Sequence, residues 1–272
     1  MIPKIIHFFW GNSTMPYMRY LTIESFAKHN PSWEIRLYLS EKKDSGPTWT
    51  SFEQKAHSIN SGSDYSKKID LIKNLTVCNL DFSKIRINNS VAEVHKSDIL
   101  RWYLLYTIGG VWGDMDIIFI KPIDPLVNNK SLCITKYDYD KSGKCLPIGF
   151  IGSESNNEVF KEIYEQALLH FDKNSYQCSG TQVFSKIMVK HFGKNLGQKI
   201  FNEKLIYPVG PRSIDKLYTE DPRILGVINN AIAIHWYGGH NKSAEYCNKI
   251  NSHDDLIKNK RCNLFSAYLN TN

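Results

Sequence analysis

Residues 97–116 read SDILRWYLLYTIGGVWGDMD. The first part of this stretch has the composition of a helix, and Gly109 can adopt the left-handed conformation that ends helices. A short apolar strand follows Gly110 and ends in the triplet Asp114-Met115-Asp116. The stretch therefore predicts a helix, a sharp break and a strand in direct succession, as in α/β proteins.

The acidic triplet predicts a metal site. Side chains alternate along a strand, so Asp114 and Asp116 are expected to face the same side. Two neighbouring carboxylates repel each other unless a cation lies between them. Oxygen ligands favour Mg²⁺ or Mn²⁺, whose coordination phosphate oxygens often complete. A second triplet, Asp138-Tyr139-Asp140, makes the motif alone unspecific, so its context carries the prediction.

The helix before the triplet supplies that context. Ser90 and Glu93 match a capping box, which predicts that the helix begins there and runs to about Ile108. Asp98 and Arg101 are three residues apart and therefore share one helix face. They are candidates for holding hydroxyl groups. The alternative is an exposed ion pair, which would contribute only about 0.3–0.5 kcal/mol.

The N-terminal segment predicts one wall of a ligand crevice. Residues 2–10, IPKIIHFFW, form an apolar strand that a Gly11-Asn12 turn ends. A strand end of this kind often lines the crevice at the carboxyl edge of a sheet. Trp10 is a candidate for stacking on a nucleobase, with a core tryptophan as the alternative. A helix over 15–29 and a strand over 33–39 are expected next.

The second half of the chain predicts helices over 157–171 and 181–192 and a strand over 231–234 that runs into HWYGGH. His235 at this strand end is a candidate ligand for Mn²⁺, or a structural histidine. Residues 242–268 are expected to form a helical tail. The polar residues 40–66 are either a loop at the mouth of the site or a peripheral insertion.

Composition bounds the function. The chain has 272 residues and a net charge of +7, which suits anionic small molecules. Its basic residues are scattered, so we expect no nucleic-acid partner. Six cysteines without a CxxC pair, no signal peptide and no apolar run of eighteen residues predict a cytoplasmic protein. The basic run Lys258–Arg261 leaves open a peripheral contact with the inner membrane face.

Taken together, these motifs resemble a known group of enzymes. The unit SDILRW…LYTIGGVWGDMD is similar to the signature of DXD-containing sugar glycosyltransferases, the Och1-like family (glycosyltransferase family 32). It also resembles the catalytic domain of the large clostridial glucosylating toxins. IPKIIHFFWG at the N-terminus, GFIGSES at 149–155 and AIHWYGGH near the end support the resemblance.

The resemblance implies a GT-A fold, a Rossmann-like α/β domain with a mixed sheet flanked by helices. It implies one glycosyltransferase domain over residues 1–272. Within it, residues 1–130 would mainly bind the nucleotide sugar and the metal. Residues 131–272 would mainly form the acceptor side and the helical tail. The donor would be a UDP- or GDP-sugar, the cofactor Mn²⁺ or Mg²⁺, and the acceptor a glycan or glycolipid.

Residue roles carried over from the family concern the donor first. Phe9 and Trp10 would contact the base, and Trp10 would stack on it. Asp98 and Arg101 would hold hydroxyls of the donor sugar, and Asp114 would contact ribose and sugar. Asp98, Arg101 and Asp114 are thus the predicted catalytic residues.

The metal ligands implied by the resemblance are Asp114, Asp116 and His235. The ion would bridge the diphosphate, which is the leaving group. The family often has a tryptophan where this chain has His240.

The resemblance also implies transfer with retention at the anomeric carbon. No carboxylate in the sequence stands out as a covalent nucleophile, so we expect attack by the acceptor hydroxyl from the leaving-group side. Surface polysaccharide synthesis is the expected setting. Two alternatives remain at this stage: a metal-dependent phosphohydrolase, which would favour more His and Asp ligands, and a non-catalytic carbohydrate-binding protein.

Overall fold

The computed structural model describes residues 1–11, 14–40, 63–135, 146–193, 195–196 and 200–271. The second acidic triplet at 138–140 lies outside the described residues, and so does 41–62, most of the polar stretch with two predicted alternatives.

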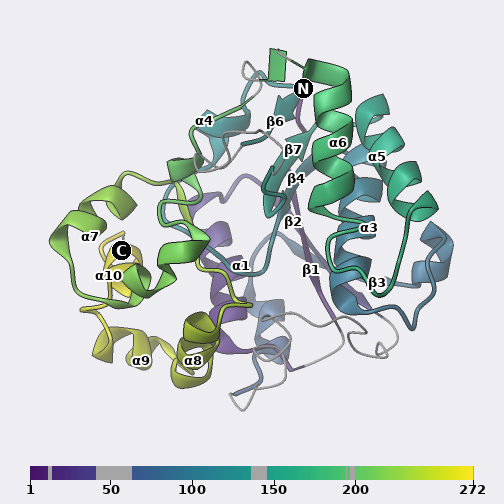
Figure 1. The fold of residues 1–272 in the computed structure, drawn as a ribbon. Coiled ribbons are helices and arrows are strands. Elements are labelled where there is room, and N and C mark those ends of the chain that lie inside the picture. The colour runs from purple at the N-terminus through teal and green to yellow at the C-terminus, as the bar shows by residue number, and fades with distance from the viewer. Residues whose placement is uncertain (12–13, 41–62, 136–145, 194, 197–199, 272) are drawn as a thin grey trace.

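A six-stranded mixed sheet lies at the centre (Figure 1). Its strands follow the order β3 (Leu75–Leu80), β2 (Glu34–Ser40), β1 (Ile5–Trp10), β4 (Gly110–Gly113), β7 (Phe150–Ser153) and β6 (Leu132–Cys133). The first four strands are parallel to one another, whereas β7 runs antiparallel to both of its neighbours. A parallel sheet is covered on both faces, which explains why the central residues of β1, including His7, are all buried rather than buried on alternate positions.

Helices cover both faces of this sheet (Figure 1). On one face lie α3 (Glu93–Thr107), α5 (Glu158–Leu169) and α6 (Thr181–Phe192). They share a hydrophobic core that includes Trp102, Phe160 and Phe184. On the other face lies α1 (Tyr17–His29), the helix predicted over 15–29. Most of its residues are buried, because α1 also packs against a second, smaller sheet.

The second sheet joins segments that are far apart in the chain. It consists of β5 (Ile117–Phe119) paired antiparallel with β8 (Ala233–His235), which confirms the strand predicted near 231–234. Strands from both predicted halves therefore share both sheets, and the division into functional halves stays a prediction. The remaining helices are short: α4 (Asp124–Val127), α7 (Pro222–Asn229), α8 (Asn241–Lys249), α9 (His253–Lys258) and α10 (Asn263–Leu269). The last three form the predicted tail.

Short segments of 3₁₀ helix also occur in the described chain, at η1 (Ser66–Leu71), η2 (Phe82–Ile85), η4 (Glu203–Leu205) and η5 (Pro211–Tyr218). No helix in the described residues is both long enough and apolar enough to cross a membrane.

The sequence predicted the C-terminal end of α3 correctly and the capping of its N-terminal end wrongly. The helix begins at Glu93 after Ala92, and no side chain caps it, so the predicted capping box is wrong. The Ser90 hydroxyl instead donates to Asn88, because the chain turns locally before the helix starts. The predicted stop is confirmed: Gly109 has a φ of +72°. A Cβ on this glycine would also lie 2.4 Å from the backbone nitrogen of Ser155.

Candidate active site

The candidate site lies where the strand order of the large sheet changes direction. From β1 the chain proceeds outward to β2 and β3 on one side, and β4 joins β1 on the other. In such sheets the crevice beyond the carboxyl ends of the two central strands is the usual ligand site. Trp10 is the last residue of β1 and Asp114 follows β4 directly, so both lie at this edge.

The acidic triplet is a turn and not a strand end. β4 stops at Gly113 and β5 begins at Ile117, in a different sheet. Long-range contacts hold this turn: Thr22 on α1 donates from its hydroxyl to the carbonyl of Met115 over 3.0 Å. The Trp236 amide likewise donates to the Asp116 carbonyl over 2.9 Å. Strand alternation was therefore the wrong reason to expect neighbouring carboxylates, although the turn does bring them together.

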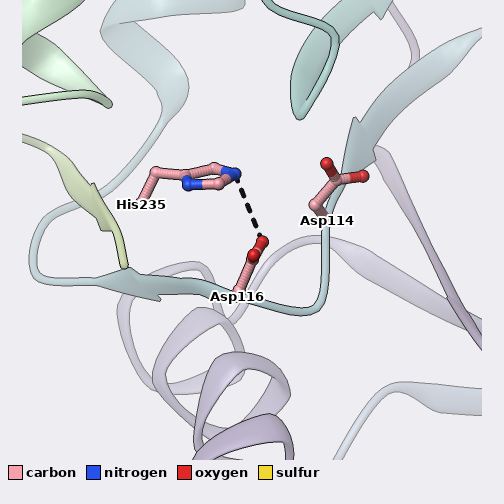
Figure 2. A group of neighbouring side chains, drawn as sticks. All are labelled: Asp114, Asp116 and His235. Carbon is pink, nitrogen blue, oxygen red and sulfur yellow. Dashed lines mark ion pairs between the residues drawn. The ribbon is translucent and has the colours of Figure 1, made fainter. Parts of the chain in front are cut away.

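Asp114, Asp116 and His235 converge on one space (Figure 2). Each offers one ligand atom, and these atoms all lie within 4.8 Å of one another. His235 comes from the end of β8, which β5 holds in place by pairing Ile117 with His235. The two strands, although far apart in the sequence, are thus joined by sheet hydrogen bonds at the point where the ligands meet.

The donor atoms fit a divalent cation. Asp116 Oδ1 is buried and has no hydrogen-bond partner among the described residues, although His235 Nε2 lies 3.2 Å away. A buried acceptor without a partner is costly, and a cation would satisfy it. Gly149 keeps the space open: a Cβ there would lie 2.9 Å from Asp114 Oδ2 and 3.0 Å from His235 Nε2. Two carboxylates with one imidazole suit Mn²⁺.

Asp116 is held as an anion. Burial alone would raise the pKa of this carboxyl group, but His235 and Arg19 outweigh burial and lower it. The Gly238 amide contributes in the same direction by donating to Asp116 Oδ2 over 2.7 Å. An ionised carboxylate fixed by several chain segments is the form in which a metal ligand is needed.

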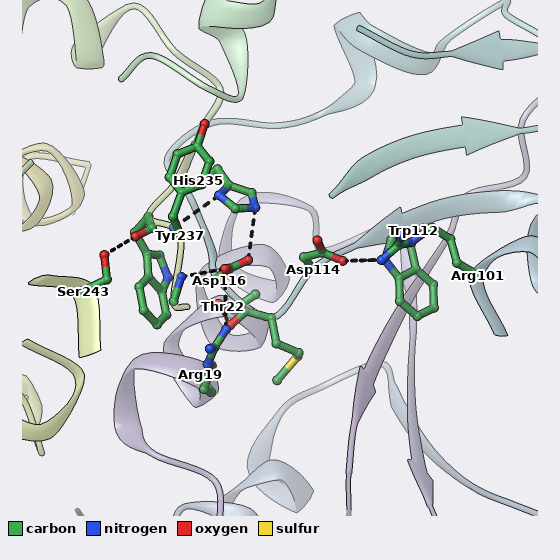
Figure 3. Close-up of polar contacts among 12 residues, drawn as sticks. Arg19, Thr22, Arg101, Trp112, Asp114, Asp116, His235, Tyr237 and Ser243 are labelled. Atoms are coloured by element: carbon green, nitrogen blue, oxygen red, sulfur yellow. Dashed lines mark hydrogen bonds and ion pairs between the residues drawn. The ribbon is translucent and has the colours of Figure 1, made fainter. Parts of the chain in front are cut away.

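Arg101 connects α3 to the acidic turn (Figure 3). It donates from Nη1 to Asp98 over 3.0 Å and from Nη2 to Asp114 Oδ1 over 2.9 Å. Trp112 Nε1 donates to the same Asp114 oxygen over 2.7 Å. Oδ1 of Asp114 is therefore held by Arg101 and Trp112, while Oδ2 faces the space beside Gly149.

Asp98 and Arg101 are buried, with only 4% and 3% of their surface exposed. Ser179, at the entry to α6, donates its hydroxyl to the second oxygen of Asp98 over 3.3 Å. Burial, the largest influence, raises the pKa of Asp98 to about 6 despite the opposing charge of Arg101. The alternative of an exposed ion pair is wrong, because α3 packs this face against the sheet and the loop before α6.

The two aromatic candidates at the end of β1 differ in position. Phe9 is buried and packs edge to face on Phe82, with ring centroids 5.6 Å apart, so its ring belongs to the core. Trp10 is half-buried at the carboxyl edge. The guanidinium of Arg19 lies 5.5 Å from the centre of its ring.

Several site residues escaped the sequence prediction. Arg19, Trp112, Gly149 and Gly238 contact the predicted ligands. The last three lie inside stretches that support the resemblance, but no role was predicted for them. Arg19 falls within an ordinary helix pattern, and only tertiary packing brings it near Asp116. His240 is not part of the group of converging ligands: it is exposed, and its Nδ1 accepts a hydrogen bond from the Lys242 amide at the start of α8.

Two known protein families match parts of the chain. Residues 17–132 match the family described as a glycosyltransferase sugar-binding region containing a DXD motif. Residues 75–200 match the family described as a capsular polysaccharide synthesis protein. A search of curated protein sequences gave no significant match. The first match includes the helix, the break and the acidic turn on which the resemblance rested.

Solved structures that match this chain include three glycosyltransferases. PaToxG glycosyltransferase is 17% identical, with a TM-score of 0.51 and coverage of 98% of this chain and 86% of that one. Galactosyltransferase LgtC, solved with donor and acceptor sugar analogues, is 14% identical, with a TM-score of 0.47 and coverage of 89% and 93%. GlyE of Streptococcus pneumoniae TIGR4 is 13% identical, with a TM-score of 0.49 and coverage of 99% and 63%. The match to PaToxG supports a shared fold over nearly the whole chain.

Proposed function

We propose that the chain, which has a GT-A fold, is a glycosyltransferase that transfers a sugar from a nucleoside-diphosphate donor with the help of a divalent metal. The donor is a UDP- or GDP-sugar and the acceptor is a hydroxyl of a glycan or a lipid-linked glycan. The match of residues 75–200 to a capsular polysaccharide family supports a role in surface polysaccharide synthesis. The narrower relation to the Och1-like enzymes and the clostridial toxins stays a prediction.

One observation carries this proposal: the convergence of Asp114, Asp116 and His235 around a space that Gly149 leaves open. When bound there, Mn²⁺ would stabilise the negative charge that develops on the leaving diphosphate. The buried Asp116 oxygen without a hydrogen-bond partner supports a cation rather than a purely structural cluster.

The remaining residues bind and orient the donor. Trp10 covers one face of the nucleobase at the carboxyl end of β1. Asp114, fixed by Arg101 and Trp112, accepts hydrogen bonds from the ribose and the sugar. Asp98 and Arg101 are the predicted contacts to the sugar hydroxyls. Because both side chains are almost completely buried, we propose that only their few exposed atoms reach the sugar. Their main role is then to set the orientation of Asp114.

We propose retention of configuration. The three carboxylates of the described site have other tasks: Asp98 pairs with Arg101 and Ser179, Asp114 with Arg101 and Trp112, and Asp116 faces His235. We assign each of them to orienting the donor or binding the metal, which leaves none for the covalent nucleophile that double displacement requires. The acceptor hydroxyl would then attack from the side of the departing diphosphate, which takes its proton. A product of inverted configuration in an NMR assay would exclude this route.

The decisive experiment is a screen of UDP- and GDP-sugars for donor hydrolysis and transfer in the presence of Mn²⁺. Asp116→Ala should lose activity by at least about 100-fold, since a metal ligand is removed. Asp70→Ala, at an exposed position on η1, is the matched control and should retain activity. Turnover of no donor, or equal turnover by the two variants, would contradict the proposal.

A further inference from the structure

Arg19 is a buried cation that the predicted roles leave unexplained. It lies on α1 and only 9% of its surface is exposed. Arginine is rarely buried to this extent unless it is paired. The sequence did not indicate a role for Arg19, and we therefore infer its role from the contacts of its guanidinium.

The guanidinium of Arg19 contacts two aromatic rings and one carboxylate. Its Cζ lies 5.5 Å from the ring centre of Trp10 and 4.7 Å from that of Trp236. Its Nη1 lies 3.8 Å from Asp116 Oδ2 (Figure 3), which is too long for a hydrogen bond. Arg19 therefore acts on Asp116 through charge and on the rings through stacking.

Gly238 makes this arrangement possible. A Cβ at Gly238 would lie 2.2 Å from Nη2 of Arg19, so any larger residue would displace the guanidinium. The amide of Gly238 donates to the same Asp116 oxygen that Arg19 faces. Asp116 Oδ2 is thus held by a backbone N–H and a cation, while Oδ1 faces His235. Arg19 acts from the side of the carboxylate opposite the candidate metal space.

We propose that Arg19 is a positioning residue that joins the base-binding end of the site to its metal-binding end. The inference rests on the proposed function, in which Trp10 stacks on the base and Asp116 binds the metal. Arg19 supports the Trp10 ring from one side and so favours stacking of a base on the ring. The same positive charge partly neutralises Asp116 and weakens the hold of the free enzyme on a divalent cation.

Arg19 thus strengthens the binding of the nucleotide and weakens the binding of the metal alone. Together these two effects favour binding of the metal with the nucleotide rather than before it. A metal site that is weak by itself gains ligands when a diphosphate arrives with its own negative oxygens. Asp114, Asp116 and His235 would then hold a divalent cation firmly only while a diphosphate is also bound. Loss of a residue that only stabilised the fold would not raise the affinity for the metal while lowering the affinity for the nucleotide.

The test measures two equilibria without any turnover. Mn²⁺ alone is titrated and the free ion followed by EPR; UMP and GMP are titrated in EDTA and followed by tryptophan fluorescence. In Arg19→Met, Mn²⁺ binding should tighten by about three- to tenfold, the scale of one unit charge acting on a divalent ion in a hydrated site. Nucleotide binding should weaken by about three- to tenfold as the support of Trp10 is lost.

Arg19→Lys separates charge from shape. Lysine keeps the charge but lacks the flat guanidinium, so Mn²⁺ affinity should stay within about twofold of the wild type while nucleotide binding weakens. This conservative variant also provides the test if Arg19→Met does not fold. Arg36→Met is the matched control, because Arg36 is a half-buried arginine paired with Glu34 on β2. It should change neither equilibrium.

Weakening of both equilibria in Arg19→Met, or no change in either, would overturn the role of Arg19. Equal behaviour of the Met and Lys variants toward Mn²⁺ would overturn the part assigned to charge. If the wild type binds neither Mn²⁺ nor a nucleotide, the proposed function itself fails. Failure of the inference and failure of the proposed function are thus distinguishable.

Discussion

Gly149→Ala should block the metal space while leaving the fold in place. A Cβ at this position would lie 2.9 Å from Asp114 Oδ2 and 3.0 Å from His235 Nε2. These atoms bind a metal at about 2.0–2.2 Å, so a methyl group between them would occupy the position of the ion. We expect Mn²⁺ affinity to fall by about 10- to 100-fold, comparable to the loss of a metal-supporting residue.

The cost to stability should be smaller. Gly149 does not have the positive φ that favours glycine, so the backbone accepts alanine, and local crowding should cost about 1–3 kcal/mol. The assay combines a Mn²⁺ titration followed by EPR with the Mn²⁺ dependence of donor turnover. Gly226→Ala is the control, because a Cβ there has no neighbour within 4 Å. Unchanged Mn²⁺ affinity in Gly149→Ala, with Asp116→Ala inactive, would refute the steric reasoning.

Three further predictions concern stability. Arg101→Met removes the cation between two carboxylates and should cost about 3–5 kcal/mol in urea unfolding, whereas a cost below 1 kcal/mol would contradict the pairing. Mn²⁺ at about 100 times its Kd should stabilise the protein by about 2.7 kcal/mol. Asp116→Asn should abolish this gain, and EDTA should reverse it. Burial lowers the pKa of His7 to about 4, so His7 is neutral when folded but protonates in the unfolded chain near pH 6.5. The contribution of neutral His7 to the free energy of unfolding is complete above pH 6.5, and about 3 kcal/mol of it is lost as the pH falls to 4. His7→Gln should reduce this pH dependence in unfolding titrations.

The regular elements followed from local patterns. The helices over 157–171 and 181–192 and the strand over 33–39 were predicted within one or two residues, because apolar spacing reflects which face a segment buries. The break at Gly109 was predictable for a similar reason, since a left-handed residue is needed to end α3 there. The predicted capping box was wrong because Ser90 is not the residue that precedes the helix. Asn88 accepts a hydrogen bond from the Ser90 amide in a local turn, and the helix starts after Ala92.

The site was only partly predictable. The candidate ligands Asp114, Asp116 and His235 were identified from residue type and position at the ends of apolar segments. The burial of Asp98 and Arg101 was not, since the Asp-x-x-Arg spacing is the same in an exposed pair and a buried one. Phe9 and Trp10 were equivalent candidates in sequence, yet β1 directs Phe9 toward Phe82 in the core.

The sequence by itself determined the α/β pattern, the helix–break–acid unit and the residue types from which a metal site could be built. These depend on interactions between residues close together in the chain. Tertiary structure alone decided that the acidic triplet is a turn between two sheets. It also brought Arg19 and Gly238 to the same oxygen of the Asp116 carboxylate. Asp116 and Gly238 are 122 positions apart, and no periodicity extends that far: only the pairing of β5 with β8 and the packing of α1 brings them together.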